Sequence, residues 1–492
     1  GDHRDLHRVD RRQRQMCIRD RPGSERCAGI LHPIFSLHQP GFGQAALDFI
    51  DFVADSGLKV WQILPLNPAG QGGSPYNSCS SFAIDPRWLD EDILSQRTDF
   101  KANTPAAQRR YGVGADSACR QRFARFIVEQ HHWLVDYACF VVAHEYYQSA
   151  WQQWPEGLRA RRPAALADFK RDFAVQIDAV CFEQFLLDEQ WHSIRRAANA
   201  KGVLILGDLP IFVAADSADV WANQSQFELD SHGNPQRVAG VPPDYFSQTG
   251  QRWGNPLYRY DLMAADGYTW WQQRFARQVA LYDWVRIDHF RGLVAYWAID
   301  QSAPTAMEGR WIDGPKDDLL EALKAGVGGY LPVVAEDLGI ITQEVTDLKD
   351  RFDLPGMLIM QFAFEGGLEN NYHPENHCRQ AVVYTGTHDN NTTLGWWQEL
   401  SGNEQAHVRK VLEQTQGIPN DMPMPEALIH SAMKSVASVA IIPAADWLAL
   451  DGSARINTPG TVENNWSWRA PEGVFDAKLA KSIRSLCQQY RR

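Results

Sequence analysis

The stretch Trp284-Val-Arg-Ile-Asp-His-Phe-Arg-Gly-Leu293 combines a strand-like half with a cluster of charges. Its first half is apolar and β-forming, as expected of a buried strand. Four ionisable residues then fall within six positions: Arg286, Asp288, His289 and Arg291. A buried strand carries so many charges only at its end, where they are paired and face a cavity. The carboxyl ends of the strands of a (β/α)8 barrel form such a cavity.

Within this stretch, Arg286 and Asp288 are expected on the same side of the strand, because side chains alternate along it. We expect the guanidinium to keep Asp288 ionised. An ionised carboxylate held in place is a candidate nucleophile. A buried ion pair that only braces a loop is the alternative, and this stretch alone leaves both interpretations open.

The bulk composition limits the classes of function. The chain has 492 residues, of which 44% are apolar and 22% charged, and its net charge is −12. The length fits a barrel with insertions. The acidic balance argues against nucleic acid or an anionic membrane as the main partner, and we find no apolar run long enough for a membrane span. The eight cysteines lack paired spacing, which favours cytoplasmic free thiols over a disulfide or zinc framework.

Eight apolar, β-forming runs are spread along the chain, with helical or inserted segments between them. They are residues 28–35, 59–66, 203–207, 284–287, 331–335, 357–363, 381–385 and 437–442. A helix predicted over residues 44–57 separates the first two runs and gives the first β-α-β unit. We therefore predict an α/β fold: a (β/α)8 TIM barrel with large helical and loop insertions.

The chain divides into segments of different character. Residues 1–27 hold eight arginines and almost no periodic apolar residues, and we expect a disordered or artefactual tail. The catalytic barrel is expected over residues 28–482. It contains a mainly helical insertion at about 88–200 and an active-site loop region at about 214–260. Within that region we expect residues 239–256 to form an ordered loop that covers a groove.

Carboxylates stand at the ends of four predicted strands: Asp208, Asp288, Glu336 and Asp389. Barrel closure brings such strand ends to one mouth. Cleavage of a glycosidic bond needs a set of this kind, because one carboxylate attacks the anomeric carbon while another protonates the leaving oxygen. Neighbouring negative charges would raise the pKa of the acid. A third carboxylate beside a histidine can bind sugar hydroxyls and favour a distorted ring.

Each of these residues also has a purely structural interpretation. Glu336 can form a salt bridge at a strand end, and Asp389 can cap a helix. His388 can bind a metal, but one His-Asp pair without a further ligand is a weak signal, so we predict no metal. We favour one shared site, because the alternative requires three separate coincidences at one barrel mouth.

Three segments resemble the catalytic signatures of the amylomaltases, the disproportionating enzymes or 4-α-glucanotransferases of the α-amylase clan. They are Arg286-Ile-Asp-His-Phe-Arg-Gly292, Ala335-Glu-Asp-Leu-Gly339 and Gly386-Thr-His-Asp-Asn390. Further matching segments are 74–76, 207–213, 242–247, 250–258, 455–461 and 465–469. The resemblance runs from about Gly29 to Arg469. It fails in the N-terminal tail and after Leu37, where a glycine-rich loop is shorter than expected.

The resemblance implies a role for each carboxylate. Asp288 would be the nucleophile, Glu336 the acid/base and Asp389 the stabiliser of the transition state. Arg286 and His388 would be their partners, and Asp208 would line the donor sugar site. Further substrate-binding residues, on or near a loop that closes over the acceptor, would be Tyr76, Tyr245, Phe246, Trp253 and Asn255.

The implied activity is transfer of α-1,4-glucan segments from donor to acceptor maltooligosaccharides by retaining double displacement, without cofactor or metal. A retaining α-glucan hydrolase of the same clan, a non-catalytic saccharide-binding barrel and a metal hydrolase are the alternatives. We predict that the carboxyls of Asp288 and Glu336 lie about 5–5.5 Å apart, the separation of retaining enzymes. We expect a cytoplasmic protein, monomeric or a weak homo-oligomer, whose partners are α-1,4-glucans and neither nucleic acid nor membranes.

Overall fold

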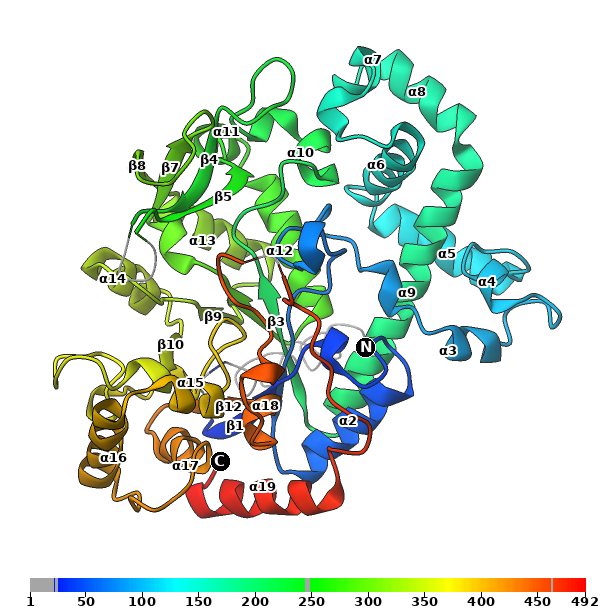
Figure 1. Ribbon diagram of the computed structural model, residues 1–492. Coiled ribbons are helices and arrows are strands. Elements are labelled where there is room, and N and C mark those ends of the chain that lie inside the picture. Colours follow the sequence, from blue (N-terminus) through cyan, green and yellow to red (C-terminus); the bar gives the residue numbers. More distant parts are fainter. Residues whose placement is uncertain (1–21, 23–24, 244–247, 462) are drawn as a thin grey trace, which may run out of the picture.

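Eight parallel strands form a nearly closed barrel in the computed structural model, which describes residues 22, 25–243, 248–461 and 463–492 (Figure 1). Their spatial order is β10-β11-β12-β1-β2-β3-β6-β9. Every predicted run contributes one barrel strand, so the predicted fold class is confirmed. The strands are β1 (Cys27–Leu31), β2 (Val60–Gln62), β3 (Leu204–Leu209), β6 (Trp284–Ile287), β9 (Val333–Ala335), β10 (Gly356–Ile359), β11 (Ala381–Tyr384) and β12 (Val439–Pro443).

The barrel closes between β9 and β10, at the two ends of the strand order. The N–H of Ala335 donates to the carbonyl of Pro355 at 2.9 Å. A carboxylate oxygen of Asp337 accepts from the N–H of Met357 at 2.7 Å. We call this junction the seam. The side chain of Asp337 thus provides one of the hydrogen bonds that join β9 to β10. The other neighbouring strands of the barrel are joined by backbone pairing.

Six of the eight strands are shorter than the apolar runs that predict them, whereas β6 matches its run and β3 extends beyond it to Leu209. The first strand ends at Leu31 rather than at residue 35, because Pro33 has no N–H to donate to a ladder. The run predicted to continue to residue 363 ends as a strand at Ile359 and turns into a 3-10 helix, Met360–Phe362. The remaining apolar residues of these runs pack where the chain leaves the strand ends.

A second, four-stranded antiparallel sheet lies beside the barrel mouth, and its order is β5-β4-β7-β8. Its strands are β4 (Arg237–Val241), β5 (Gln251–Pro256), β7 (Ala295–Asp300) and β8 (Gly309–Asp313). The expectation of a loop over residues 239–256 is therefore wrong at both ends, where residues 239–241 belong to β4 and residues 251–256 form β5. β5 is largely polar and gives no apolar alternation, so its pairing with β4 across a bulge leaves no signal in the sequence.

Helices surround the barrel on its outer side (Figure 1). Their ends follow ordinary capping: Ser401 and Glu404 form a capping box at the start of α16, and Gly417 ends it with φ of 64°. The barrel helices are α2 (Gln44–Asp55), α12 (Thr269–Leu281), α13 (Lys316–Gly326), α14 (Gln343–Arg351), α15 (Thr393–Glu399), α16 (Gly402–Gln416), α17 (Glu426–Lys434), α18 (Ala444–Trp447) and α19 (Ala477–Tyr490). Two short helices, α10 (Ala218–Ala222) and α11 (Tyr260–Ala265), lie by the helical insertion and the second sheet instead (Figure 1).

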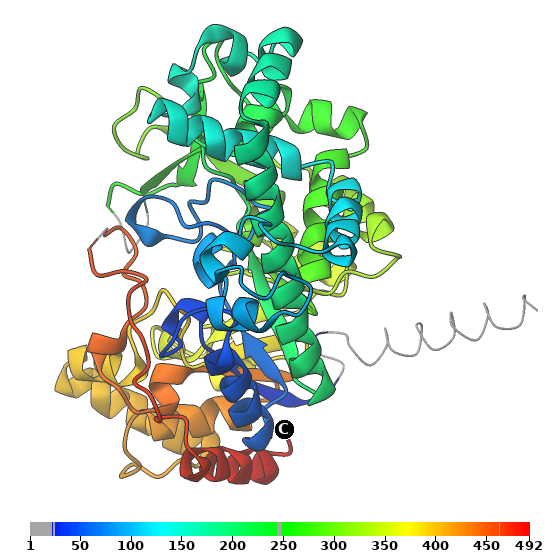
Figure 2. The ribbon, with the colours of Figure 1, turned by 90° about the vertical axis from the view of Figure 1, so that its right-hand side faces the viewer.

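The predicted insertion at about 88–200 is helical, and the long helix α9 runs from it back along the barrel (Figure 2). The aromatic stripes expected to be core are buried, including Phe123, Phe182 and Trp191. Two glutamines of α9 tie it to the chain: Gln184 bonds both backbone groups of Ile84, and Gln190 bonds both backbone groups of Asp90. The helices are α3 (Glu91–Gln96), α4 (Ala106–Arg109), α5 (Ser117–Glu129), α6 (Leu134–Tyr147), α7 (Glu156–Arg159), α8 (Pro163–Asp172) and α9 (Ala174–Ala200).

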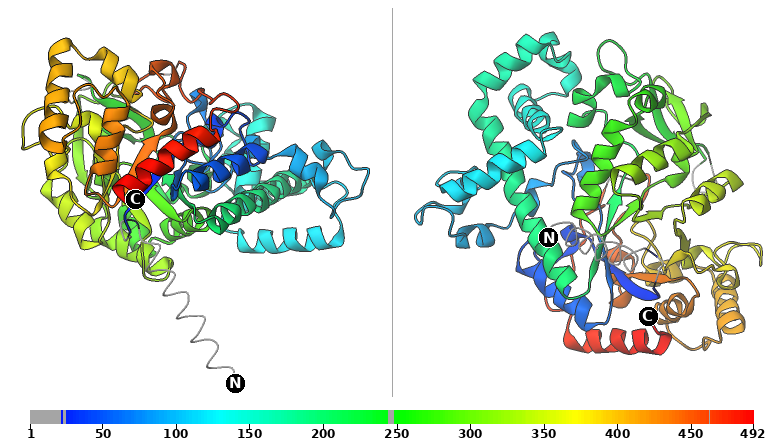
Figure 3. Two further views of the ribbon diagram at one scale, coloured as in Figure 1. Left: turned by 90° about the horizontal axis from the view of Figure 1, so that it is seen from below. Right: turned by 180° about the vertical axis from the view of Figure 1, so that it is seen from behind.

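The two ends of the described chain meet at the barrel floor, where α19 crosses beside α2 (Figure 3). β1 pairs with β12, the first barrel strand with the last. Arg492 donates to the carbonyls of Cys27, Ser435 and Met433 at 3.0, 2.8 and 2.7 Å. This guanidinium therefore links the start of β1 to the C-terminal end of α17. Among the described residues, we find no helix with the length and apolar character that a membrane span requires.

Candidate active site

Strand alternation places the charged groups inside the barrel mouth. Apolar residues such as Leu206, Trp284 and Val334 fill the barrel interior. Asp208, Arg286 and Glu336 follow them at steps of two, and Asp288 continues the step beyond β6. β3, β6 and β9 are neighbours in the barrel, so their carboxyl ends lie side by side. The sequence therefore predicts correctly that these side chains meet at one mouth.

Arg286 joins two of the carboxylates. Its guanidinium donates to both oxygens of Asp208, at 2.9 and 2.7 Å, and pairs with Asp288 at 2.9 Å. Asp208 is fully buried, whereas the side chain of Asp288 keeps 29% of its surface exposed. A substrate can therefore reach Asp288 while Asp208 and Arg286 hold their positions behind it. The predicted pairing of Arg286 with Asp288 is confirmed.

Glu336 lies beside this pair and is held by the backbone. One carboxylate oxygen accepts from the N–H of His289 at 2.6 Å, and the other accepts from the N–H of Leu338 at 2.9 Å. His289 adopts a left-handed conformation, with φ of 49°, which is uncommon for a residue with a side chain. The turn after Asp288 therefore directs an N–H at the neighbouring carboxylate, and strain of this kind is typical of functional sites.

Burial governs the protonation of the two carboxyls. Burial and three neighbouring carboxylates raise the pKa of Asp288 to about 8, although Arg286 opposes the shift. Burial also raises the pKa of Glu336, against the effect of Arg286 and of two backbone N–H groups. The expectation that Arg286 keeps Asp288 ionised is therefore wrong: Arg286 lowers the pKa of Asp288, but burial and the neighbouring carboxylates outweigh it. The pair instead competes for protons near neutral pH, because two negative charges in one buried site repel each other.

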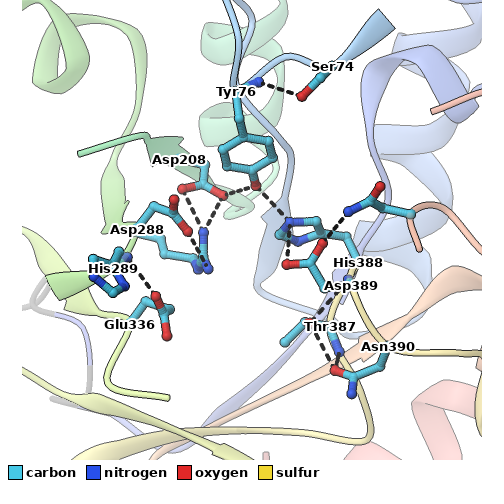
Figure 4. Close-up of polar contacts among 12 residues, drawn as sticks. Ser74, Tyr76, Asp208, Asp288, His289, Glu336, Thr387, His388, Asp389 and Asn390 are labelled. Carbon is cyan, nitrogen blue, oxygen red and sulfur yellow. Dashed lines mark hydrogen bonds and ion pairs between the residues drawn. The ribbon is translucent and has the colours of Figure 1, made fainter. Parts of the chain in front are cut away.

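Asp389 faces the other two carboxyls from the loop after β11 (Figure 4). The side-chain amide of Asn457 donates to its carboxylate at 2.6 Å, and Arg455 donates to its backbone carbonyl at 2.8 Å. His388 lies 3.4 Å from the same carboxylate. Asp389 caps no helix in the structure, since α15 begins after Thr392, whose hydroxyl accepts from the N–H of Gly395.

Tyr76 connects the two halves of the site (Figure 4). Its hydroxyl donates to Asp208 at 2.7 Å and lies 2.9 Å from Nε2 of His388. The rings of Tyr76 and His388 stack with centroids 5.3 Å apart. Burial lowers the pKa of His388, so its ring is neutral near pH 7 and can accept as well as donate a hydrogen bond. One chain of contacts thus runs from Asp389 to Arg286.

The predicted aromatic residues have different positions. Trp253 is 38% exposed and meets the ring of His289 edge-on, with centroids 5.0 Å apart. The amide of Asn255 donates to the carbonyl of Val213 at 2.9 Å, and so braces the loop after β3. Two further predicted residues, Tyr245 and Phe246, lie outside the described residues.

Three residues of the site were not singled out individually from the sequence. Asn457 and Arg455 hold Asp389, as described above, and the ring of Trp466 packs against Tyr76 at 5.7 Å and His388 at 6.0 Å. All three belong to segments 455–461 and 465–469, which the resemblance marks as matching. That match was the available signal, because nothing in composition or periodicity links these segments to a strand end.

The arrangement suits acid–base and nucleophilic chemistry at one carbon atom. Three carboxyls surround one opening at the mouth of a (β/α)8 barrel, and a neutral histidine and a tyrosine hydroxyl lie beside them. Within the described part of the chain, no group of three or more His, Cys, Asp or Glu side chains could hold a metal ion. Fold and site together define an enzyme of glycosidic bonds.

Comparison with known proteins gives the particular family. The model of the 4-alpha-glucanotransferase family matches residues 32–474, and the chain belongs to this family. A 4-alpha-glucanotransferase of Thermus thermophilus is 42% identical over 489 residues, which cover 93% of this chain and 97% of that one. A chloroplastic/amyloplastic 4-alpha-glucanotransferase of Arabidopsis thaliana is 39% identical and covers 96% and 86%. Transfer of glucan, the predicted activity, is thereby confirmed.

Solved structures agree with this assignment. An amylomaltase from Streptococcus agalactiae in complex with acarbose superposes with a TM-score of 0.87 at 31% identity, and the match covers 95% of this chain and all of that one. An amylomaltase from Corynebacterium glutamicum gives a TM-score of 0.74 at 19% identity, over 94% and 73%. The second likeness shows the shared fold.

Proposed function

We propose that Asp288 is the nucleophile, Glu336 the acid/base and Asp389 the stabiliser of the transition state in a retaining transfer between α-1,4-glucans. The ion pair of Arg286 with Asp288 carries this proposal, because it holds a partly exposed carboxylate in one orientation beside a second carboxyl. The two carboxyls, from adjacent strands, are expected about 5–5.5 Å apart, the separation of retaining enzymes.

The first half of the reaction breaks the donor chain. A carboxylate oxygen of Asp288 attacks the anomeric carbon, and the bond from that carbon to the glycosidic oxygen breaks. Glu336 gives its proton to this oxygen, and the reducing-side chain leaves. In the second half, the 4-hydroxyl of an acceptor attacks the same carbon and gives its proton to Glu336. The bond to Asp288 breaks, and the configuration at the anomeric carbon is retained.

The two carboxyls share one proton before the reaction begins. Their raised pKa values favour one proton on the pair at neutral pH. We propose that the proton lies on Glu336 in the reactive state, in which the guanidinium of Arg286 contacts the negative charge of Asp288. This is the state that the first half requires. Activity is therefore expected to fall in acid, when both carboxyls are protonated, and in alkali, when neither is.

The site has a donor side and an acceptor side. We assign the donor sugar to the side of Tyr76 and His388, because Asp389 closes that side and its carboxylate is available to sugar hydroxyls. Asp208 is fully buried and supports this side through its hydrogen bond with the Tyr76 hydroxyl. The leaving and accepting oxygens must lie near Glu336. That side carries His289 and Trp253, and we assign the first acceptor sugar to it.

Incubation with maltotriose tests the balance between transfer and hydrolysis. We expect a ladder of longer maltooligosaccharides together with glucose, because bound sugar displaces water from the glycosyl-enzyme. Shorter sugars alone would support the hydrolase alternative. Exhaustive treatment with a chelator should leave the ladder unchanged, since the mechanism uses no metal.

The variant Asp288→Asn tests the proposed nucleophile. It keeps the size of the side chain but removes the attacking charge, so turnover should fall by at least about 10⁴-fold while maltooligosaccharide binding, measured by calorimetry, persists. The exposed Asp261→Asn on α11 is a matched control. Full turnover in Asp288→Asn would refute the assignment and would be compatible with a different nucleophile.

We further propose that the protein acts in the cytoplasm as a monomer or weak homo-oligomer. The cysteines in the described part of the chain are unpaired, as in a reducing compartment. We also propose that residues 28–482 form the catalytic unit, with a mainly helical unit inserted at about 88–200. Limited proteolysis and sedimentation at several concentrations test these statements.

A further inference from the structure

Arg291 and Trp311 form a stacked pair outside the carboxylate site. The guanidinium carbon of Arg291 lies 3.9 Å from the centre of the indole ring. The same guanidinium donates to the carbonyl of Ile340 at 2.7 Å, which fixes its position. Trp311 lies on the edge strand β8 and is 40% exposed. A large aromatic side chain is therefore exposed at the surface. Its partner, Arg291, follows Asp288 by three residues in the sequence.

Neighbouring residues hold the indole of Trp311 in place. Trp297 contacts it edge-on, with ring centroids 5.3 Å apart, and donates its own N–H to the carbonyl of Ala306 at 2.9 Å. Gly309 leaves room for Trp297, since a Cβ there would lie 2.4 Å from that ring. The exposed ring is thus pre-organised, and binding to it would lose little conformational entropy.

Arg291 has hydrogen-bonding capacity to spare. Among the described residues it forms no ion pair, and its guanidinium donates one hydrogen bond, from Nη1 to the carbonyl of Ile340. A guanidinium is a planar fork of donors, suited to a pair of neighbouring oxygens. A sugar ring offers such oxygens in its vicinal hydroxyls, and it offers flat C–H faces that stack on indole. The pair therefore fits a saccharide better than an apolar partner.

The position of the Arg291–Trp311 pair indicates which side of the active site a glucan bound to it would occupy. The donor pocket lies towards Tyr76 and His388, on the opposite side of the site from Glu336 (Figure 4). The acid/base must lie next to the leaving and accepting chain. His289 adjoins Glu336 on that side, and Arg291 follows His289 by two residues. Its guanidinium bonds the carbonyl of Ile340, four residues after Glu336, so the pair lies on the acceptor side.

We propose that the Arg291–Trp311 pair is a distal acceptor subsite, which binds an α-1,4-glucan beyond the first acceptor sugar. This rests on the proposed function, because the acceptor side is defined by the role of Glu336. The subsite favours long acceptors over glucose, since only a long chain reaches both the acid/base and Trp311.

Kinetics with an α-maltotriosyl fluoride donor test the subsite. Fluoride is the leaving group, so the glycosyl-enzyme forms with no sugar on the acceptor side. In Trp311→Ala, we expect the KM for maltohexaose as acceptor to rise about tenfold, the size of one aromatic contact, while the KM for glucose changes less than about twofold. Trp311→Phe should keep most of the affinity. Tyr146→Ala removes an aromatic that is 61% exposed on α6 and serves as the control.

Equal changes for both acceptors, or no change for either, would overturn the subsite. Binding of maltohexaose to Asp288→Asn, with and without Trp311→Ala, gives a second readout that needs no turnover, and we expect binding about tenfold weaker in the double variant. Release of fluoride at full rate by Asp288→Asn alone would instead contradict the proposed nucleophile. Failure of the subsite and failure of the mechanism are thus separate results.

Discussion

Arg286 is the residue on which the geometry of the site depends. It is buried, and it contacts Asp208 and Asp288 together. Without it, two adjacent carboxylates would repel each other in a poorly solvated site. Arg286 offsets burial and that repulsion only in part, because the pKa of Asp288 is still raised to about 8. The functional arrangement therefore destabilises the fold at neutral pH.

The variant Asp288→Asn should be more stable than the parent protein at pH 8. A carboxyl whose pKa is raised on folding stabilises the protein fully below its unfolded pKa and loses that contribution as pH rises to the folded value near 8. The amide has no such loss, so we expect a gain of about 1–2 kcal/mol at pH 8. Denaturant unfolding at pH 8 and pH 4 measures it. An equal gain at both pH values would contradict this origin.

At the scale of elements, apolar runs identified the eight barrel strands, and alternation identified which side chains face the mouth. The second sheet could not be predicted in this way. β5 has mostly polar residues and pairs with β4, which pairs in turn with β7, a strand far along the chain, so tertiary pairing rather than local pattern defines the sheet. The contact between Asn457 and Asp389 spans 68 residues without any periodic link.

The segment that contains Asn457 is expected to control the orientation of Asp389. Asn457→Ala removes the amide that donates to this carboxylate at 2.6 Å. We expect kcat to fall about 10- to 100-fold, because a misplaced catalytic group costs about this much, with a smaller change in KM. Glu463→Ala, an exposed change in the same segment, is the control. A change in KM alone would show that Asn457 binds sugar without positioning Asp389.

At the scale of the whole molecule, the mouth and the floor of the barrel have separate tasks. The carboxylates occupy the mouth, while the floor joins the first and last strands. Arg492 binds five backbone carbonyls there, those of Cys27, Ala432, Met433, Ser435 and Ser438. Residues at the floor should therefore affect stability and leave catalysis unchanged.

The variant Arg492→Ala tests this separation. It leaves several partly buried carbonyls without a donor, so we expect a loss of about 1–3 kcal/mol in the free energy of unfolding. The kcat and KM at low temperature should stay within about twofold of the parent values. Arg491→Ala removes the same charge at an exposed neighbour and is the control. A fall in kcat before any loss of folded protein would show that floor and mouth are coupled.

The seam has a consequence for the acid/base. Glu336 directly follows β9, the strand that meets β10 through the Ala335–Pro355 bond and the carboxylate of Asp337. Local opening should be easiest at such a join. Deuterium should therefore enter the amides of Ala335 and Met357 sooner than those of β1. A bound oligosaccharide that contacts both sides of the seam should slow this exchange. Uptake as slow as in β1 would show a rigid wall. Faster uptake would show that Glu336 belongs to a part of the barrel that opens locally. Its carboxyl can then follow the leaving glycosidic oxygen as the two sugars separate.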